Sequence, residues 1–272
     1  MSSNEAPVEA VPVTDLPYAA PAPAPAPARR SPRVWPPVVL VGLFWAYCLV
    51  SDRIEMPTFT RFLSQMAALI GLMLAFTIWW LASRGLRLSQ RLIVLGVAIA
   101  GGALFFTFVG TFTYVTFRLE APPFSYSLST ASLVFLLWLT GLAGPLTGRA
   151  ADRVGWRRVT ALMIGVSTAG LLLTLSDTLP LLVLGLGLVA AAMFTGYTAT
   201  QLGVGDVART DRGSASALYF TTYYGAGSLG AYLPGIAWER WGWGGVATVG
   251  FVALALAAAA LAVAGERLPH RP

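Results

Sequence analysis

The chain has 272 residues, of which 56% are hydrophobic and 11% are charged, and it carries a formal net charge of +6. Soluble domains usually contain about 25% charged residues, so this composition excludes an ordinary soluble domain and favours a membrane protein. The basic residues of the sequence are all arginine and lie between apolar runs. This indicates topological signals and not a nucleic-acid-binding patch.

Eight apolar stretches without a charged residue follow one another along the chain. They cover residues 34–51, 62–83, 92–117, 121–148, 159–176, 178–205, 213–238 and 241–265. Since a transmembrane helix needs about 20 such residues, the sequence predicts an all-α integral membrane protein with about eight transmembrane helices. The first stretch is the weakest candidate for a transmembrane helix, because only a short apolar core follows Pro36 and Pro37.

These stretches divide the chain into four parts. We predict a disordered Ala/Pro-rich tail at 1–33, a two-helix membrane segment at 34–91, a six-helix domain at 92–265 and a short tail at 266–272. The first tail has no basic region followed by an apolar one, so we do not expect a signal peptide. Most arginines lie in the tails and in every second connection. The positive-inside rule therefore predicts cytoplasmic termini for a multi-pass protein of the cell (inner) membrane.

The connection between the fourth and fifth stretches has the most specific pattern, GRAADRVGWRR over residues 148–158. Glycine gives the backbone freedom for a tight turn, and clustered arginines hold a connection on the cytoplasmic side. The carboxylate can accept charge-assisted hydrogen bonds from arginine or from a helix N-terminus. An ordinary arginine-rich turn is the alternative interpretation. The residues singled out here are Gly148, Asp152, Arg153, Gly155, Arg157 and Arg158.

This connection resembles the cytoplasmic signature loop of the major facilitator superfamily, and the resemblance extends over about residues 100–265. It includes FVGTFTYV at 108–115, APPF at 121–124, SASALY at 214–219, YYG at 223–225 and WERWGW at 238–243. Together these segments look like the C-terminal six-helix half of an efflux-type transporter for drugs or sugars. The resemblance implies a small-molecule substrate, alternating access by rocking helix bundles, and a domain of 3+3 inverted repeats.

An internal repetition in the sequence agrees with such repeats. DRVGW at 152–156 recurs as ERWGW at 239–243, and each copy follows the second apolar stretch of a group of three. Equivalent placement of the two copies favours a duplicated three-helix unit over a chance match.

Hydroxyl-bearing residues concentrate in the apolar stretches at 92–117, 178–205 and 213–238. Polar groups inside a membrane need partners or a water-filled cavity. The alternative is that each hydroxyl bonds to the backbone of its own helix. Our hypothesis is a substrate path lined by Thr111, Tyr114, Tyr197, Thr198, Thr221 and Tyr224.

Residues 225–230, GAGSLG, match the G-x-G-x-x-G pattern of dinucleotide-binding sites. That site also needs a preceding strand and an acidic residue about 20 positions later, and the sequence has neither. The run lies inside an uncharged stretch. We therefore expect Gly225, Gly227, Gly230 and Pro234 to permit close helix packing or a kink.

The first two stretches resemble a different class of protein. PRVWPP at 32–37, EMP at 55–57 and the pair Trp79 and Trp80 resemble the membrane anchor that precedes some bacterial quinoprotein-like β-propellers. This resemblance covers residues 29–91.

The apolar stretches hold no acidic or basic residue, and the lone Cys48 and His270 lie far apart. We therefore expect no enzyme activity, no cofactor and no metal site. A complete facilitator has two six-helix halves with the substrate between them. A homodimer in the lipid bilayer, with both copies in the same orientation, would rebuild that arrangement. The alternative function is a non-transporting membrane anchor or interaction protein.

Overall fold

A computed structural model describes residues 35–82 and 86–266, and every regular element in these two ranges is a helix. The predicted tail at 1–33 lies outside the described residues, as does nearly all of the predicted tail at 266–272. The elements are α1 (Trp35–Ser51), α2 (Thr58–Ala82), α3 (Leu88–Glu120), α4 (Leu128–Ala131), the 3-10 helix η2 (Ser132–Ala143), α5 (Gly144–Val154), α6 (Trp156–Leu173), α7 (Leu179–Val207) and α8 (Arg212–Glu266).

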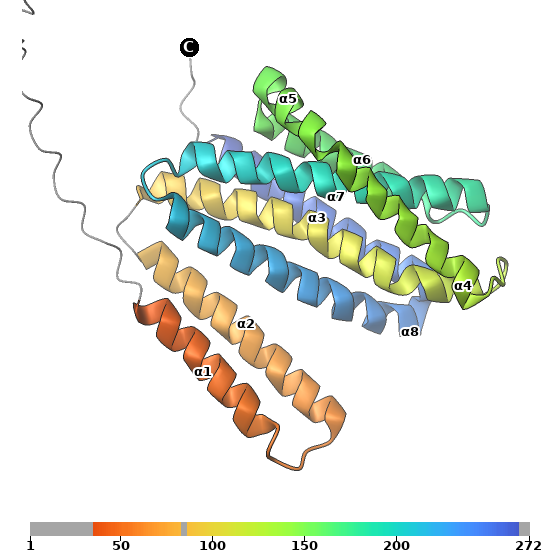
Figure 1. The fold of residues 1–272 in the computed structure, drawn as a ribbon, viewed down its shortest axis with the longest axis horizontal. Coiled ribbons are helices and arrows are strands. Elements are labelled where there is room, and N and C mark those ends of the chain that lie inside the picture. Colours follow the sequence, from red (N-terminus) through yellow and green to blue (C-terminus); the bar gives the residue numbers. More distant parts are fainter. Residues whose placement is uncertain (1–34, 83–85, 267–272) are drawn as a thin grey trace, which may run out of the picture. The chain divides into compact units, whose positions relative to one another are not determined.

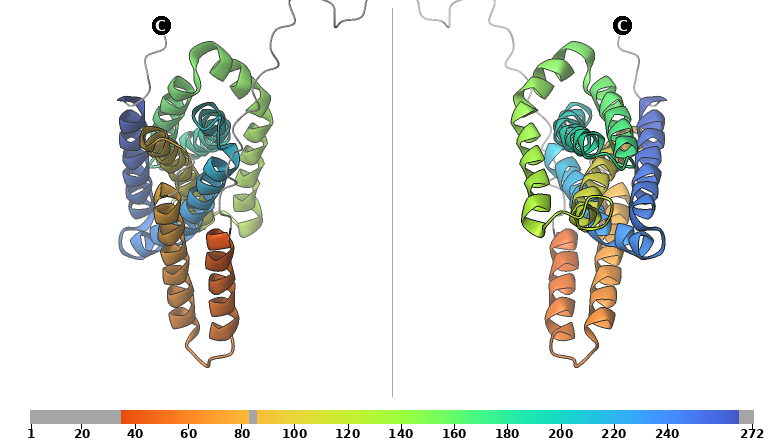
Figure 2. Two further views of the ribbon diagram at one scale, coloured as in Figure 1. Left: turned by 90° about the vertical axis from the view of Figure 1, so that its left-hand side faces the viewer. Right: turned by 90° about the vertical axis from the view of Figure 1, so that its right-hand side faces the viewer.

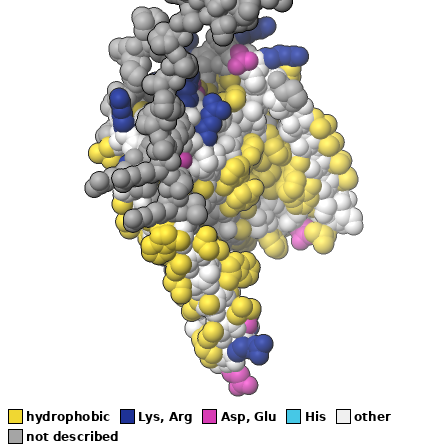
Figure 3. All heavy atoms as spheres, turned by 60° about the vertical axis from the view of Figure 1, so that its left-hand side comes forward, with side chains coloured by type: hydrophobic (Ala, Val, Ile, Leu, Met, Phe, Trp, Pro, Cys, Tyr) yellow, Lys and Arg dark blue, Asp and Glu magenta, His cyan; other side chains and the backbone are white. Residues whose placement is uncertain are grey.

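The first two helices form an antiparallel hairpin. Its turn holds charged residues, while its sides expose large apolar side chains, as Figure 3 shows. Near the turn, the Gln65 side chain donates a hydrogen bond to the Ser51 hydroxyl at 3.1 Å, which ties the helices together. An apolar surface of this kind is stable when lipid covers it.

Helix α3 is the most buried of the long helices. Within its most apolar 18-residue window 72% of the residues are buried, against 6% in α2. It packs against α7 and against both parts of α8, as Figures 1 and 2 show. The small residues Gly96 and Gly102 allow this, because the first lies on Ala260 and the second on Ala226.

The 55 residues assigned to α8 are two helices that reverse direction at Gly242. This residue has φ 56° and ψ −142°, a conformation that is essentially restricted to glycine. After the reversal, Gly245 packs on the backbone of Ala237. The parts at 212–241 and 243–266 correspond to the seventh and eighth predicted stretches.

The fourth predicted stretch, 121–148, differs from the single helix that we expected. It contains α4, η2 and the first turn of α5, with a bend of 53° between the helices before and after the break. Pro145 lacks an amide hydrogen and so cannot continue the regular hydrogen-bond ladder. Twelve residues of 3-10 helix are unusually many, since this geometry normally persists for only about 3–4 residues.

Four described helices are long and apolar enough to cross a membrane, or five if the bent pair is one span. That test treats α8 as one helix and leaves out the shorter α1. The protein is an all-α membrane protein, whereas the number of eight spans stays a prediction.

Side-chain contacts show which connections share an end of the bundle. Gln90 at the start of α3 donates to the carbonyl of Val207 at the end of α7. Arg157 at the start of α6 donates to the carbonyl of Gly265 at the end of α8. We call this the arginine end, because the connections predicted to be cytoplasmic meet there.

Candidate functional site

A cavity of about 630 Å³ lies between α3, η2, α7 and the first part of α8. We call it the aromatic cavity. Its lining contains no charged residue, and its volume lies within the range of pockets that bind drug-sized molecules. The lining residues are Phe105, Phe108, Val109, Phe112, Thr113, Thr116, Phe135, Trp138, Met193, Phe194, Tyr197, Tyr223 and Tyr224.

Ring contacts hold this lining in place. The rings of Phe105 and Tyr223 are stacked with centroids 4.2 Å apart, and Phe108 lies 5.4 Å from Trp138. The Tyr223 hydroxyl donates a hydrogen bond to the Met193 sulfur at 3.4 Å. Such offset and edge contacts stabilise aromatic clusters beyond the burial of their area. The cavity therefore has preformed walls on α3, α7 and α8.

Two of the six residues predicted for a substrate path, Tyr197 and Tyr224, line the aromatic cavity. Thr198 and Thr221 do not, and their hydroxyls donate to carbonyls four residues earlier in their own helices. These two threonines show the local bonding that was the alternative interpretation.

Thr111 and Tyr114 also lie away from the cavity lining. Thr111 is buried, with 2% of its surface exposed. The Tyr114 hydroxyl donates to the carbonyl of Ala231 at 3.0 Å, and its ring packs near Trp238. Both residues therefore belong to the packing of α3, and Tyr114 directly joins α3 to the first part of α8.

Most of the cavity lining was missed by the sequence reasoning, which searched for hydroxyls. The signal that could have found it is the spacing of large residues along α3. Phe105, Phe108, Phe112 and Thr116 recur every three or four positions and so share one helix face.

The segment at 148–158, which we call the signature segment, is not the loop that we expected. It is helical on both sides of a one-residue break at Gly155, whose φ is 88°. Gly148 lies inside α5, so the expected turn is not at that residue. In place of an arginine-rich turn, the segment forms the end of α5 and the start of α6, because a single glycine is enough to redirect the chain.

The charged groups of the signature segment lie on the surface. Asp152, Arg153 and Arg158 are exposed. Arg157 is half-buried, and its guanidinium donates to the carbonyl of Gly265 at 3.4 Å. Asp152 is therefore open to a partner outside the described residues.

The small residues of α8 lie where helices approach one another closely. An added Cβ at Gly230 would lie 2.5 Å from the carbonyl oxygen of Phe106. Gly227 faces Phe105, Pro234 lies on Gly110, and Gly225 faces Met73 of α2.

The repeated motif has a glycine with positive φ in both copies. Gly155 and Gly242 hold equivalent positions in DRVGW and ERWGW, and they are the two glycines with positive φ among the described residues. Gly155 lies at the arginine end, and Gly242 lies at the opposite end, next to Trp243 and the α6–α7 turn. The two equivalent breaks at opposite ends fit an inverted repeat.

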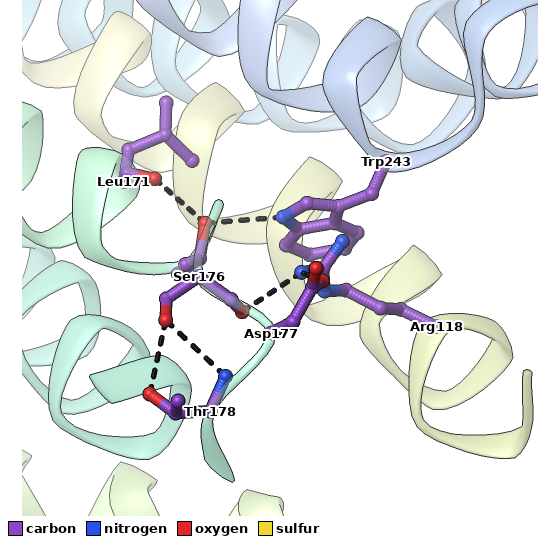
Figure 4. A network of polar contacts seen from close by, with 7 residues as sticks. Arg118, Leu171, Ser176, Asp177, Thr178 and Trp243 are labelled. Carbon is purple, nitrogen blue, oxygen red and sulfur yellow. Dashed lines mark hydrogen bonds and ion pairs between the residues drawn. The ribbon is translucent and has the colours of Figure 1, made fainter. Parts of the chain in front are cut away.

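At the end opposite the signature segment, Arg118 joins α3 to the α6–α7 turn and to α8 (Figure 4). Its guanidinium donates to the carbonyl of Ser176 at 2.9 Å and pairs with Asp177 at 3.3 Å. It also lies 5.3 Å from the ring centroid of Trp243, whose indole donates to the Thr174 hydroxyl at 3.2 Å. No charge pattern in the sequence indicated this network.

Within residues 35–82 and 86–266 no group of three or more His, Cys, Asp or Glu side chains could hold a metal ion.

The chain is similar to several curated proteins over about half its length. It is 30% identical over 139 residues to "Uncharacterized MFS-type transporter YybF" of Bacillus subtilis, which covers 51% of this chain and 34% of that protein. It is 34% identical over 172 residues to "Inner membrane transport protein YnfM" of Escherichia coli, covering 63% of this chain and 40% of that protein. This chain is related to MFS-type transporters.

An "Uncharacterized transporter" of Buchnera aphidicola subsp. Baizongia pistaciae is 27% identical over 155 residues, covering 56% of this chain and 37% of that protein. The matched region thus spans between about a third and two fifths of these relatives' own length. No family model matches the chain. No solved structure matches it.

Proposed function

We propose that the protein is a membrane transporter that exports a small organic molecule, a drug or a sugar, by alternating access. The aromatic cavity is the observation that carries this proposal. It lies among four helical elements of an all-α membrane protein, and it is large enough for a drug-sized ligand. The relationship to MFS-type transporters supports the same function.

The proposal includes a second copy of the chain. The chain supplies one group of helices where a complete facilitator has two, with the substrate between them. Two copies side by side in the inner membrane, with their termini in the cytoplasm, would close the aromatic cavity from both sides. The exposed Asp152 would then contact a helix end of the other copy.

The mechanism contains no covalent step. Rocking of the two bundles exposes the aromatic cavity first to the arginine end and then to the opposite end. During this movement the Arg118 network holds α3 and the α6–α7 turn of one bundle together at the end opposite the arginine end.

The test is flux through vesicles that contain the full chain, with a panel of lipophilic cations, aromatic anions and sugars. We expect saturable flux for at least one class, and a reduction of about tenfold in Asp152→Asn. Asp52→Asn, which changes an exposed acid in the α1–α2 turn, is the matched control.

A folded protein without flux for any class would overturn the proposal. It would favour a membrane anchor or interaction protein, to which the exposed apolar α1–α2 hairpin is suited. Photobleaching of single fluorescently labelled particles in lipid tests the dimer, and one bleaching step for every particle would contradict it.

A further inference from the structure

A second hollow, of about 700 Å³, lies where α7 ends and α8 begins, at the arginine end of the bundle. We call it the polar vestibule. Six of its eight lining residues carry a polar or charged group, and three of them are charged, in contrast to the aromatic cavity. Its lining residues are Tyr197, Thr198, Gln201, Leu202, Gly205, Asp206, Arg209 and Arg212.

The charges of the vestibule do not cancel. Arg209 forms an ion pair with Asp206, which neutralises both groups. Arg212 has no ion-pair partner among the described residues and adds a net positive charge. An arginine guanidinium binds carboxylate, sulfonate and phosphate groups through paired hydrogen bonds.

Gln201 supplies a further donor. Its side-chain nitrogen is buried and has no hydrogen-bond acceptor within the described part of the chain. A buried donor without an acceptor costs about 1–3 kcal/mol, so rotation of the Gln201 amide toward a ligand oxygen in the vestibule would relieve this cost.

Tyr197 lines both the polar vestibule and the aromatic cavity, so one side chain borders the two spaces. A molecule that extends past Tyr197 would therefore meet aromatic rings on one side and a positive, donor-rich surface on the other.

We infer that the aromatic cavity and the polar vestibule together bind an amphipathic organic anion. Its apolar body lies among the rings of α3, η2, α7 and α8, and its carboxylate, sulfonate or phosphate head lies beside Arg212 and Gln201. This inference rests on the proposed function and names its substrate class. Aromatic walls alone would accept a cation equally well through cation–π contacts. The preference for an anionic ligand therefore comes from the polar vestibule.

The test is equilibrium binding to the full chain in nanodiscs of phosphatidylcholine, with empty nanodiscs as the blank. Three probes share one naphthalene body: naphthalene-2-sulfonate, 2-naphthyltrimethylammonium and 2-naphthylmethanol. Calorimetry should give the sulfonate an affinity at least tenfold higher than that of the cation and of the alcohol.

Variants assign the two ends of the probe. Arg212→Gln should lower sulfonate affinity about tenfold and leave the alcohol unchanged, whereas Arg212→Lys should retain most of the preference. Trp138→Ala should weaken all three probes alike, because it removes a cavity wall. Arg149→Gln, an exposed arginine of the signature segment, is the matched control and should change nothing.

Binding preference for the cation, equal affinity for all three probes, or no binding of any probe would overturn the inference. So would an equal loss for all probes in Arg212→Gln. Repeating the titration with phosphatidylglycerol in the nanodiscs separates two sources of the anion. Competition indicates a lipid, and undiminished sulfonate binding indicates a soluble aromatic anion.

This binding assay does not depend on transport. Sulfonate binding without flux would reject transport and retain the site, whereas flux of a cation without sulfonate binding would retain transport and reject the site.

Discussion

Replacing Arg118 by glutamine should destabilise the fold far more than removing its ionic partner. The guanidinium donates to the carbonyl of Ser176 at 2.9 Å, and it lies 5.3 Å and 5.7 Å from the ring centroids of Trp243 and Phe124. Only 13% of the Arg118 side chain is exposed, whereas Asp177 is 76% exposed. The carbonyl and ring contacts are therefore desolvated, and the ion pair is screened by solvent.

The magnitudes decide which contact dominates. A hydrogen bond from a charged group contributes about 1.5–3 kcal/mol, and each cation–π contact about 0.5–1 kcal/mol. An ion pair with an exposed partner contributes roughly 0.2–1 kcal/mol. Because these contributions are not additive, we expect Arg118→Gln to lower the free energy of unfolding by roughly 2–4 kcal/mol. Asp177→Asn should lower it by less than about 1 kcal/mol.

The measurement is reversible unfolding in mixed micelles, followed by tryptophan fluorescence and circular dichroism. Arg240→Gln, at an exposed arginine of α8 next to the Gly242 reversal, is the control for loss of a positive charge. The reasoning fails if Asp177→Asn costs as much as Arg118→Gln, since the exposed ion pair would then dominate. It also fails if Arg118→Gln and Arg240→Gln cost the same.

Three further substitutions test other contacts, each read as a change in the free energy of unfolding. Gly155→Ala should cost about 1–3 kcal/mol because φ is 88° there, whereas Gly148→Ala, inside α5 with open space around it, should be neutral or stabilise by about 0.5–1 kcal/mol; equal effects would contradict the assigned break. Gly230→Ala should cost about 1–3 kcal/mol, since its Cβ would press on a backbone carbonyl of α3, and an effect as small as that of Gly148→Ala would show that α3 and α8 can separate freely. Tyr219→Phe removes a buried 2.7 Å hydrogen bond to Thr200 and should cost about 1 kcal/mol; no loss would mean that the threonine hydroxyl is satisfied by its own helix.

The positions of the helices could be predicted from the distribution of charge, because lipid excludes both unpaired charges and open backbone. The helix ends could not. Helix α3 runs from Leu88 to Glu120, past the charged residues that bounded the predicted stretch at 92–117. Arg91 and Arg118 stay in the helix because each donates to a carbonyl of a neighbouring segment. The two partners lie 10 and 58 residues away, in other segments, so the local pattern of each helix end does not reveal them.

The candidate site was predicted only in part, and the reason is physical. A hydroxyl in an apolar stretch stands out, so Tyr197 and Tyr224 could be selected, and the structure places both at the aromatic cavity. The residues Phe108 and Trp138 look like ordinary core or interface residues in a sequence of this composition. Their role as walls depends on how η2 packs against α7, which no local pattern reveals.

The 3-10 helix η2 forms the wall of the aromatic cavity with the weakest backbone hydrogen bonds. Its hydrogen-bond geometry is poorer than that of an α-helix, and it carries Phe135 and Trp138 into the lining. The other walls belong to α-helices with regular hydrogen bonds. For a ligand in the aromatic cavity we therefore expect asymmetric size selectivity, with a bulkier molecule displacing η2 outward and a smaller one allowing η2 to move inward. Amide exchange of residues 132–143 would report the size of whatever the cavity holds.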